Sequence, residues 1–223
     1  MKQQLIVIAI DGTSASGKST NAKLVARALG YVYVDTGAMY RTLAWHCLQK
    51  RIDVHAAKTV AAECRKWKTK LDCVEAGGLR SVRLLVGVYF PEKEIRTPET
   101  AAAVPHVAAI PQVRKWMKKT QRDCIRFGNL VMEGRDIGTN VFPETDYKFY
   151  LDAHLEERSR RRTADGVREN LAARDQRDSQ RAFAPLMIAL GAKVINNSNM
   201  SSEQTSGLIL AEVRKRLAAE KRG

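Results

Sequence analysis

The stretch Gly12-Thr13-Ser14-Ala15-Ser16-Gly17-Lys18-Ser19 decides the fold of this chain of 223 residues. It follows a continuous apolar run at residues 5–10, which is typical of a strand buried on both faces of a parallel sheet. A helical pattern follows it and ends at Gly30. The spacing G-x-x-x-x-G-K-S between a strand and a helix predicts a phosphate-binding loop.

The chemistry of such a loop follows from its residue types. Glycines let consecutive backbone N–H groups turn toward phosphate oxygens, and the helix N-terminus adds the positive end of its dipole. Lys18 can then reach the β- and γ-phosphates of a nucleotide, and the Ser19 hydroxyl can ligate Mg²⁺. The motif therefore predicts a nucleotide donor but leaves the phosphate acceptor open.

The rest of the chain favours one α/β domain spanning residues 1–223. Short apolar strand patterns at residues 31–34, 130–132, 147–151 and 194–195 alternate with helical patterns. This alternation predicts a parallel sheet flanked by helices, with right-handed crossovers. No base-reading N-K-x-D segment of a GTPase occurs, nor the strand ending in Asp-Glu of larger ATPases. A small kinase fits this pattern best.

Two regions depart from the alternation. Strand patterns on either side of Gly77-Gly78 predict a hairpin, and hence a small inserted antiparallel subdomain over about residues 70–100. The charged segment at residues 155–182 predicts helices with a break at Asp165-Gly166. Two further helices are expected to be separated at Pro111, and Ser201 with Gln204 forms a capping-box spacing for a last helix.

The charge of the chain has two readings. The formal net charge is +14, and Lys and Arg crowd residues 112–126, 158–181 and 214–222. Such an excess can bind nucleic acid, or it can hold several phosphates of one small substrate pair. The last run is expected to be the solvated face of a terminal helix.

The four scattered cysteines are expected to be reduced thiols of a cytosolic protein. We expect no membrane span and no signal peptide.

Arginines occur at three places suited to phosphate binding, because a guanidinium binds phosphate oxygens in a bidentate way. The first is residues 35–41, where a strand gives way to a helix, and the second is residues 133–139, after another strand. In the third, Arg174, Asp178 and Arg181 have the spacing that puts them on one helical face. The alternative for each place is an ion-paired, solvent-exposed surface.

With these residues the chain resembles the bacterial cytidylate kinases, which move the γ-phosphate of ATP onto CMP or dCMP. The resemblance covers nearly the whole length and rests on residues 10–19, 35–41, 94–97, 133–143 and 174–185. It implies a P-loop parallel sheet flanked by helices, an inserted CMP-binding subdomain that matches the hairpin, and a helical lid over about residues 158–182.

The resemblance also implies roles for individual residues. Catalysis would depend on Lys18, Arg135, Arg174 and Arg181. The ATP phosphates would be cradled by Gly12, Thr13, Ser14, Ala15, Ser16, Gly17, Lys18, Ser19 and Thr20, with Arg158, Arg161 and Arg162 joining from the lid. The acceptor would be bound by Thr36, Gly37, Arg41, Arg114, Arg135, Asp136, Arg174, Asp178 and Arg181. Among these, Arg41, Arg135 and Arg181 would hold the CMP phosphate, Asp178 with Arg174 the sugar hydroxyls, and Arg114 with Asp136 the cytosine.

Two departures from the family pattern bear on specificity. Pro105 stands where the family commonly places a serine that contacts the base, so one hydrogen bond to cytosine is expected to be missing. Such a loss costs on the order of 1–3 kcal/mol, and discrimination against uracil should be weaker. The segment between Arg162 and Arg174 is also shorter than in better-known members, which should alter lid closure.

The expected reaction is direct in-line transfer with Mg²⁺ bound at Ser19, and Asp11, Asp35 and Glu133 are candidates for orienting the metal shell. A kinase of UMP, another nucleotide or a small metabolite is the alternative within the same class. The alternative from another class is a basic nucleic-acid-binding module that uses ATP as a switch. Aromatic residues make up only 6% of the chain, which disfavours single-strand RNA binding. We expect a cytoplasmic monomer with no nucleic-acid partner.

Overall fold

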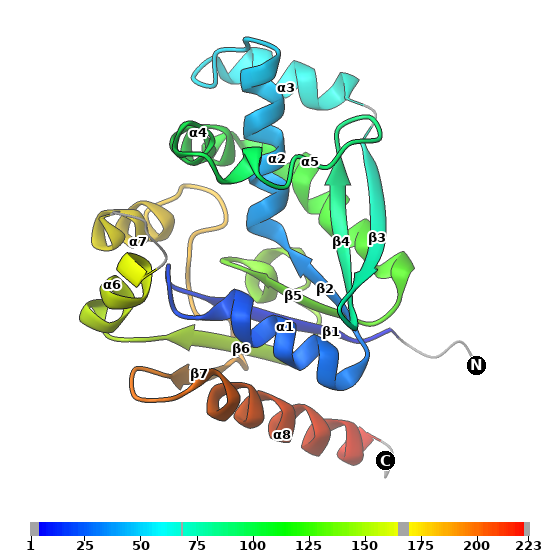
Figure 1. The fold of residues 1–223 in the computed structure, drawn as a ribbon, viewed down its shortest axis with the longest axis vertical. Helices are drawn as coiled ribbons and strands as arrows, with labels where there is room; N and C mark the ends of the chain where they lie inside the picture. The colour runs from blue at the N-terminus through cyan, green and yellow to red at the C-terminus, as the bar shows by residue number, and fades with distance from the viewer. Residues whose placement is uncertain (1–4, 68, 165–169, 221–223) are drawn as a thin grey trace.

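The computed structural model of the chain describes residues 5–67, 69–164 and 170–220. Its centre is a seven-stranded sheet of order β3-β4-β2-β5-β1-β6-β7 (Figure 1). The five strands from β2 to β7 in this order pair in parallel: β2 (Val32–Asp35), β5 (Leu130–Gly134), β1 (Val7–Gly12), β6 (Tyr147–Asp152) and β7 (Lys193–Asn196). The predicted parallel α/β fold is confirmed.

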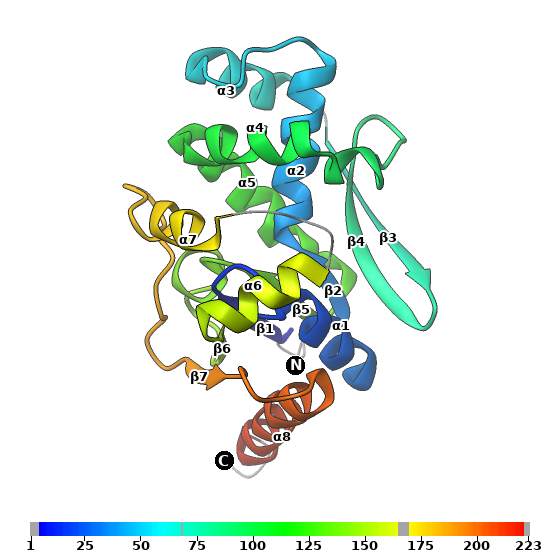
Figure 2. The same ribbon diagram turned by 60° about the vertical axis from the view of Figure 1, so that its left-hand side comes forward.

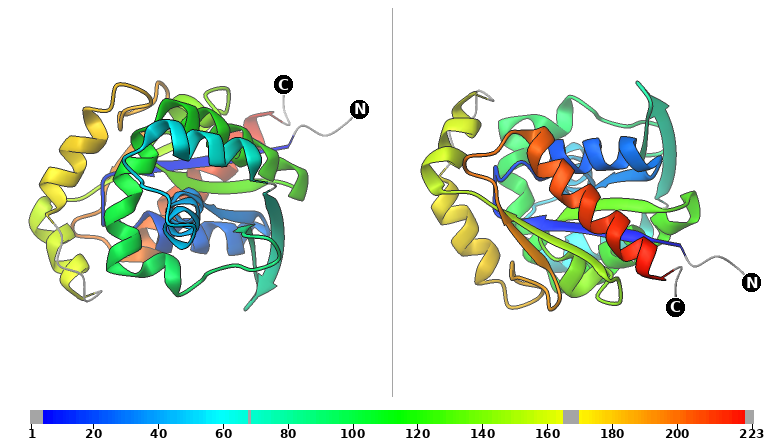
Figure 3. Two further views of the ribbon diagram at one scale, coloured as in Figure 1. Left: turned by 90° about the horizontal axis from the view of Figure 1, so that it is seen from above. Right: turned by 90° about the horizontal axis from the view of Figure 1, so that it is seen from below.

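The alternation of side chains along β1 gives the sheet two apolar faces. Val7 and Ala9 belong to a core shared with α2 (Thr36–Gln49), α3 (Ala57–Lys66), α4 (Pro98–Ala109) and α5 (Pro111–Arg122). Ile8 and Ile10 belong to a core shared with α1 (Lys18–Leu29) and α8 (Ser202–Glu220), and α8 runs along the sheet in the right-hand view of Figure 3. Helices therefore cover both faces, as a buried parallel sheet requires.

The hairpin at one edge is the predicted exception to the parallel pattern. β3 (Lys70–Ala76) and β4 (Leu79–Leu85) are antiparallel, and Gly77 and Gly78 between them both have positive φ. β4 joins the main sheet through one parallel pair, Tyr33 with Ser81, and the hairpin projects at the side of the molecule in Figure 2. The hairpin thus extends the sheet, and its role as a CMP-binding subdomain stays a prediction.

The charged segment after β6 forms two helices, α6 (Leu155–Ala164) and α7 (Leu171–Ser179). The predicted break at Asp165-Gly166 lies outside the described residues. α7 ends at Ser179, so the prediction that Arg181 shares a helical face with Arg174 and Asp178 is wrong: Arg181 lies in the loop that follows.

Other local predictions are confirmed. Pro111 begins α5, and Ile110 alone separates it from the end of α4 at Ala109. At the start of α8, the Ser201 backbone N–H donates to Gln204 Oε1 at 2.8 Å, and the Gln204 N–H donates to Ser201 Oγ at 3.2 Å. This is the reciprocal pair of a capping box. The remaining turns are the short helices Glu94–Arg96, Asp123–Phe127 and Ile137–Val141.

The carboxyl ends of β1, β2 and β5 meet at one edge of the sheet, where open α/β folds bind ligands. At the end of β1, Gly12 has a φ of +150°, and a Cβ there would lie 1.9 Å from the Leu151 carbonyl oxygen. Only glycine fits, so the phosphate loop can begin directly at the strand end. Within the part of the chain that the structure describes, no helix has the length and apolar character needed to cross a membrane.

Candidate active site

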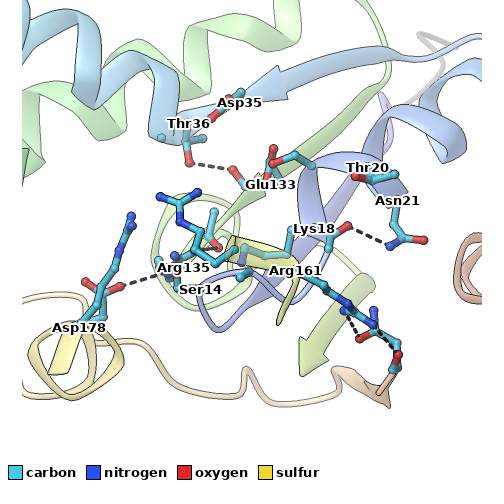
Figure 4. Close-up of a pocket in the computed structure, with 18 of the residues that line it drawn as sticks. Ser14, Lys18, Thr20, Asn21, Asp35, Thr36, Glu133, Arg135, Arg161 and Asp178 are labelled. Atoms are coloured by element: carbon cyan, nitrogen blue, oxygen red, sulfur yellow. Dashed lines mark hydrogen bonds and ion pairs between the residues drawn. The ribbon is translucent and has the colours of Figure 1, made fainter. Parts of the chain in front are cut away.

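A cavity of about 650 Å³ opens at this edge of the sheet (Figure 4). It brings together the predicted residues of both substrate groups. Its lining includes Ser14, Ala15, Gly17, Lys18, Ser19, Thr20, Thr36, Gly37, Arg41, Arg114, Arg135, Asp136, Arg161, Arg162, Arg174, Asp178 and Arg181. Gly12, Thr13 and Ser16 belong to the same loop but are not among the lining residues.

The phosphate loop joins the end of β1 to the start of α1. Gly17 has a φ of 82° and begins α1, so the first amides of the helix are available to an anion. The Lys18 ammonium is buried and folds back to donate to the Thr13 carbonyl oxygen and, at 3.4 Å, to Ser16 Oγ. Burial lowers the pKa of Lys18 well below its ordinary value, and the nearby Arg135 adds to this effect. A bound anion would reverse this effect by favouring the charged ammonium.

Glu133 is the carboxylate most closely associated with Ser19. It is the last residue but one of β5, and the Tyr33 hydroxyl donates to its Oε1 at 2.5 Å. Burial, then the charge of Asp35, raises the pKa of Glu133, while Lys18 and the hydroxyls of Ser19 and Tyr33 oppose that rise. A buried carboxylate next to a serine hydroxyl is a donor set that suits a hard divalent cation.

The other acids considered for a metal have structural partners. Asp11 accepts from the backbone N–H groups of Ile137 and Gly138 at 2.9 and 2.8 Å, and burial raises the pKa of its carboxyl to about 6. Asp35 accepts from the Ala38 N–H at 2.7 Å as the cap of α2 and pairs with Arg41 at 3.0 Å. Asp11 therefore fixes the loop after β5, and Asp35 orients Arg41.

Arginines from separate parts of the chain converge opposite the phosphate loop. Arg135 Nε donates to Asp178 Oδ2 at 3.0 Å, and Arg181 pairs with the other oxygen of the same carboxylate. Among the residues that the structure describes, the buried Arg41 Nε has no hydrogen-bond partner, so it can donate to an anion. In this arrangement Asp178, which we expected at the sugar hydroxyls, also holds two of the arginines expected at the acceptor phosphate (Figure 4).

Another part of the cavity lining contains an ion pair beside an aromatic ring. Arg114 donates to Asp136 Oδ2 at 2.6 Å, and the Arg114 guanidinium lies 5.7 Å from the centre of the Tyr40 ring. Apolar Val104 and Ala108 of α4 complete this wall. Pro105 lies between them in the helix sequence but is not among the lining residues. The base-facing serine of the family pattern thus has no polar counterpart at this position.

A further group of lining residues comes from α6 and from the segment after β7. The sequence analysis predicted Arg161 and Arg162 of this group and missed those after β7. Arg161 of α6 donates to Asn197 Oδ1 at 3.1 Å and to the Asn197 carbonyl oxygen at 2.9 Å, and Asn197 Nδ2 donates to the Ser16 carbonyl oxygen at 2.9 Å. The missed lining residues include Tyr40, Asn21, Asn197, Met200, Ser201, Ser202 and Thr205. Asn197 follows β7, so the rule that ligands bind at strand ends would have pointed to it.

Arg158 behaves differently from its neighbours on α6. It was expected to reach ATP with Arg161 and Arg162, but its side chain is buried against Ser14 and Asp175. It is not among the residues that line the cavity. Its hydrogen bond to the Ser14 carbonyl oxygen therefore supports the loop.

Comparison with known proteins gives consistent matches. A family model described as cytidylate kinase matches residues 8–215. The cytidylate kinase of Anoxybacillus flavithermus is 39% identical over 226 residues, covering 96% of this chain and 99% of that protein. The cytidylate kinase of Lactiplantibacillus plantarum is 34% identical over 231 residues, covering 97% and 98%.

A further relative has a different length. The bifunctional pantoate ligase/cytidylate kinase of Acaryochloris marina is 41% identical over 213 residues, and the match covers 90% of this chain but 40% of that protein. Among solved structures, TT1252 from Thermus thermophilus aligns over 94% of this chain and 98% of its own, with a TM-score of 0.43 and 21% identity. That likeness is too weak to carry an argument.

Proposed function

The chain belongs to the cytidylate kinase family and is a phosphotransferase with ATP as co-substrate, and we propose that it transfers the γ-phosphate of ATP to CMP or dCMP. The products would be ADP and CDP or dCDP. The observation that carries the proposal is the cavity that has a phosphate loop on one side and Arg41, Arg135 and Arg181 on the other. Such a site can hold the phosphates of both nucleotides close together.

Catalysis would depend on positioning and charge neutralisation. A CMP phosphate oxygen is already an anion near neutral pH, so attack needs no general base in the strict sense. Lys18 would hold the β- and γ-phosphates, and Arg135, Arg174 and Arg181 would neutralise charge spread over the transferred group. Closure of the lid at about residues 158–182 would exclude water and suppress wasteful hydrolysis of ATP.

The residues present fit Mg²⁺. The Ser19 hydroxyl would ligate the metal and the Glu133 carboxylate would orient its shell, supported by the interaction between these two groups and by the hydroxyl of Tyr33. When bound with ATP, Mg²⁺ supplies charge neutralisation at the β- and γ-phosphate oxygens. Glu133, held by Tyr33, would keep its carboxylate directed toward Ser19.

Base recognition would follow from Arg114 and Asp136. A carboxylate can accept from the exocyclic amine of cytosine, and a guanidinium can donate to ring acceptors. Arg161, Arg162 and the segment around Asn197 would lie beside the donor nucleotide. Arg174 and Asp178 would bind the acceptor sugar, with Thr36 and Gly37 near the acceptor phosphate.

The proposal also covers the oligomeric state, the location and the partners of the enzyme. We expect a monomer that works in the cytoplasm without a nucleic-acid partner. All four cysteines carry free thiols, as in a reducing compartment. The net charge of +14 is accounted for in part by the arginines that line the cavity.

The test is an acceptor panel. Initial rates with ATP and Mg²⁺ are measured for CMP, dCMP, UMP, AMP and GMP, each over a range of concentrations. We expect the highest kcat/KM for CMP or dCMP. Turnover confined to AMP or GMP would overturn the acceptor assignment, whereas salt-sensitive RNA binding without transfer to any free nucleotide would favour the nucleic-acid switch.

A further inference from the structure

Asp175 of α7 binds the phosphate loop although it is remote from it in sequence. Its Oδ1 accepts from the Ser14 backbone N–H at 3.0 Å, and its Oδ2 pairs with Arg158. The side chains of Asp175 and Arg158 are 15% and 9% exposed, so the ion pair is largely removed from solvent. A largely buried ion pair whose carboxylate also accepts from a backbone N–H holds its partners more firmly than a surface ion pair does.

Arg158 binds the backbone of the same residue, Ser14. Its Nη1 donates to the Ser14 carbonyl oxygen at 3.2 Å, and its Nε donates to the Ala153 carbonyl oxygen at 2.9 Å. The N–H of Ser14 therefore binds α7 through Asp175, and its C=O binds α6 through Arg158. The contact uses the N–H of Ser14 and leaves the amide groups of the later loop residues for phosphate.

The same helix carries the acceptor side of the site. Arg174 is adjacent to Asp175, and Asp178 follows three residues later, which is about 4.5 Å along a helix. Asp178 in turn holds Arg135 and Arg181. One short helix therefore connects the donor loop at Ser14 with two arginines that would bind the acceptor phosphate.

We propose that Asp175 is a positioning residue for phosphoryl transfer, because it sets α7 relative to the phosphate loop and so aligns the acceptor arginines with the donor. The inference rests on the proposed function. Misplacement by about 1 Å of groups that align the reactants can cost on the order of 100-fold in rate. The loss should fall on kcat, since Asp175 is not among the residues that line the cavity.

The test compares Asp175→Ala and Asp175→Asn with Gln176→Ala, an exposed position on the same helix. We expect Asp175→Ala to lower kcat about 100-fold while KM for ATP and for CMP changes less than threefold. Asp175→Asn keeps an acceptor for the Ser14 N–H but loses the ion pair, and should lose about tenfold. A lower KM for ATP with a raised kcat would instead mean that Asp175 competes with donor phosphate, and would overturn the proposal.

A double-mutant cycle separates positioning from general loss of structure. In an Arg181→Ala background, Asp175→Ala should cost much less than in the wild-type background, because the group it aligns is already absent. Equal losses in both backgrounds, or a loss that tracks the fall in unfolding temperature, would show a merely structural role. If wild-type and Gln176→Ala enzymes both fail to phosphorylate CMP, the proposed function itself is wrong. In that case ATP binding, measured by titration calorimetry, still reports whether the loop is intact.

Discussion

Arg114 Nη2 donates to Asp136 Oδ2 at 2.6 Å, and the two side chains are only 2% and 10% exposed. Asn140 Nδ2 donates to the same oxygen at 2.9 Å. Both bonds go to Oδ2, and Asp136 is one of the residues that line the cavity. These bonds restrain the Asp136 carboxylate at the part of the cavity where we propose that the base of the acceptor nucleotide binds.

Asp136→Asn should weaken the preference for CMP over UMP. An amide can turn its NH₂ toward the uracil carbonyl, whereas a carboxylate only accepts. We expect the ratio of kcat/KM for CMP to that for UMP to fall about 5- to 150-fold, as a change of about 1–3 kcal/mol implies. Steady-state rates with both nucleotides give the ratio, and Glu99→Gln, exposed on α4, is the control. An unchanged ratio would place the base elsewhere.

Pro105→Ser should act in the opposite direction. A serine at this position of α4 restores a hydroxyl between Val104 and Ala108, which line the base side of the cavity. One regained hydrogen bond to cytosine should raise the CMP-to-UMP ratio about tenfold. Ala101→Ser, exposed on the same helix, adds a hydroxyl away from the cavity and should leave the ratio unchanged. If both variants behave alike, the missing serine has no bearing on specificity.

Arg135→Ala should remove a donor to the acceptor phosphate while sparing ATP binding. Arg135 reaches the cavity from the end of β5 and is held by Asp178. Loss of one such donor typically lowers turnover by a factor of about 100 or more. The measurement is kcat/KM for CMP together with the Kd of ATP by calorimetry, and Arg177→Ala on the exposed side of α7 is the control. Unchanged turnover would contradict the assignment of the acceptor phosphate site.

Much of the site could be predicted because its signals are local. The loop from Gly12 to Ser19 needs only a strand, a turn and a helix in sequence, and the ends of β2 and β5 are recognisable as polar turns after apolar runs. Parallel pairing brings those ends to one edge without further information. The arginines at positions 41 and 135 follow from this reasoning directly.

The contacts of Arg158 and Asn197 could not be predicted in the same way. Both contacts depend on how α6 and β7 pack beside the loop. The position of Asn197 after a strand indicates a ligand-binding edge, but no local signal shows that its side chain, or that of Arg158, is buried against the loop. The error at Arg181 has a similar origin. Helical spacing continued the pattern through Arg181, whereas the helix ends at Ser179 and tertiary contacts with Asp178 bring the arginine in from the loop.

Gly134→Ala should raise KM for CMP. A Cβ at Gly134 would lie 2.7 Å from Thr36 Oγ1 and 2.8 Å from Ile137 Cδ1, so the Thr36 hydroxyl must leave its 2.7 Å bond to the Glu133 carbonyl oxygen. We expect KM for CMP to rise about tenfold, from the loss of about 1 kcal/mol of hydrogen bonding and the shift of the turn. In Gly207→Ala nothing lies within 4 Å of the new Cβ, and this variant should be more stable by about 0.5–1 kcal/mol with normal KM. Similar KM values in both would rule out a steric effect at the acceptor site.

Glu63 provides a pH test of stability away from the cavity. Its Oε1 accepts from Lys50 Nζ at 2.7 Å and lies 2.9 Å from His46 Nε2, and these bonds, that from Lys50 first, lower the pKa of the Glu63 carboxyl below its ordinary value of 4.5. A carboxyl whose pKa is lower in the folded state stabilises the protein when ionised. That contribution is present above the unfolded pKa and is lost as the pH falls through the folded pKa.

Glu63→Gln should therefore lower the free energy of unfolding at pH 7 by about 0.5–1 kcal/mol, since Lys50 is half exposed and the pair is partly screened. The difference from wild type should shrink as the pH is lowered below 4.5, because the wild-type carboxyl then becomes neutral as well. Urea unfolding followed by circular dichroism at several pH values measures this difference. Glu75→Gln, at an exposed position of β3, should show almost none at any pH. A constant difference from pH 7 down to pH 3 would mean that packing, and not charge, accounts for the effect of Glu63.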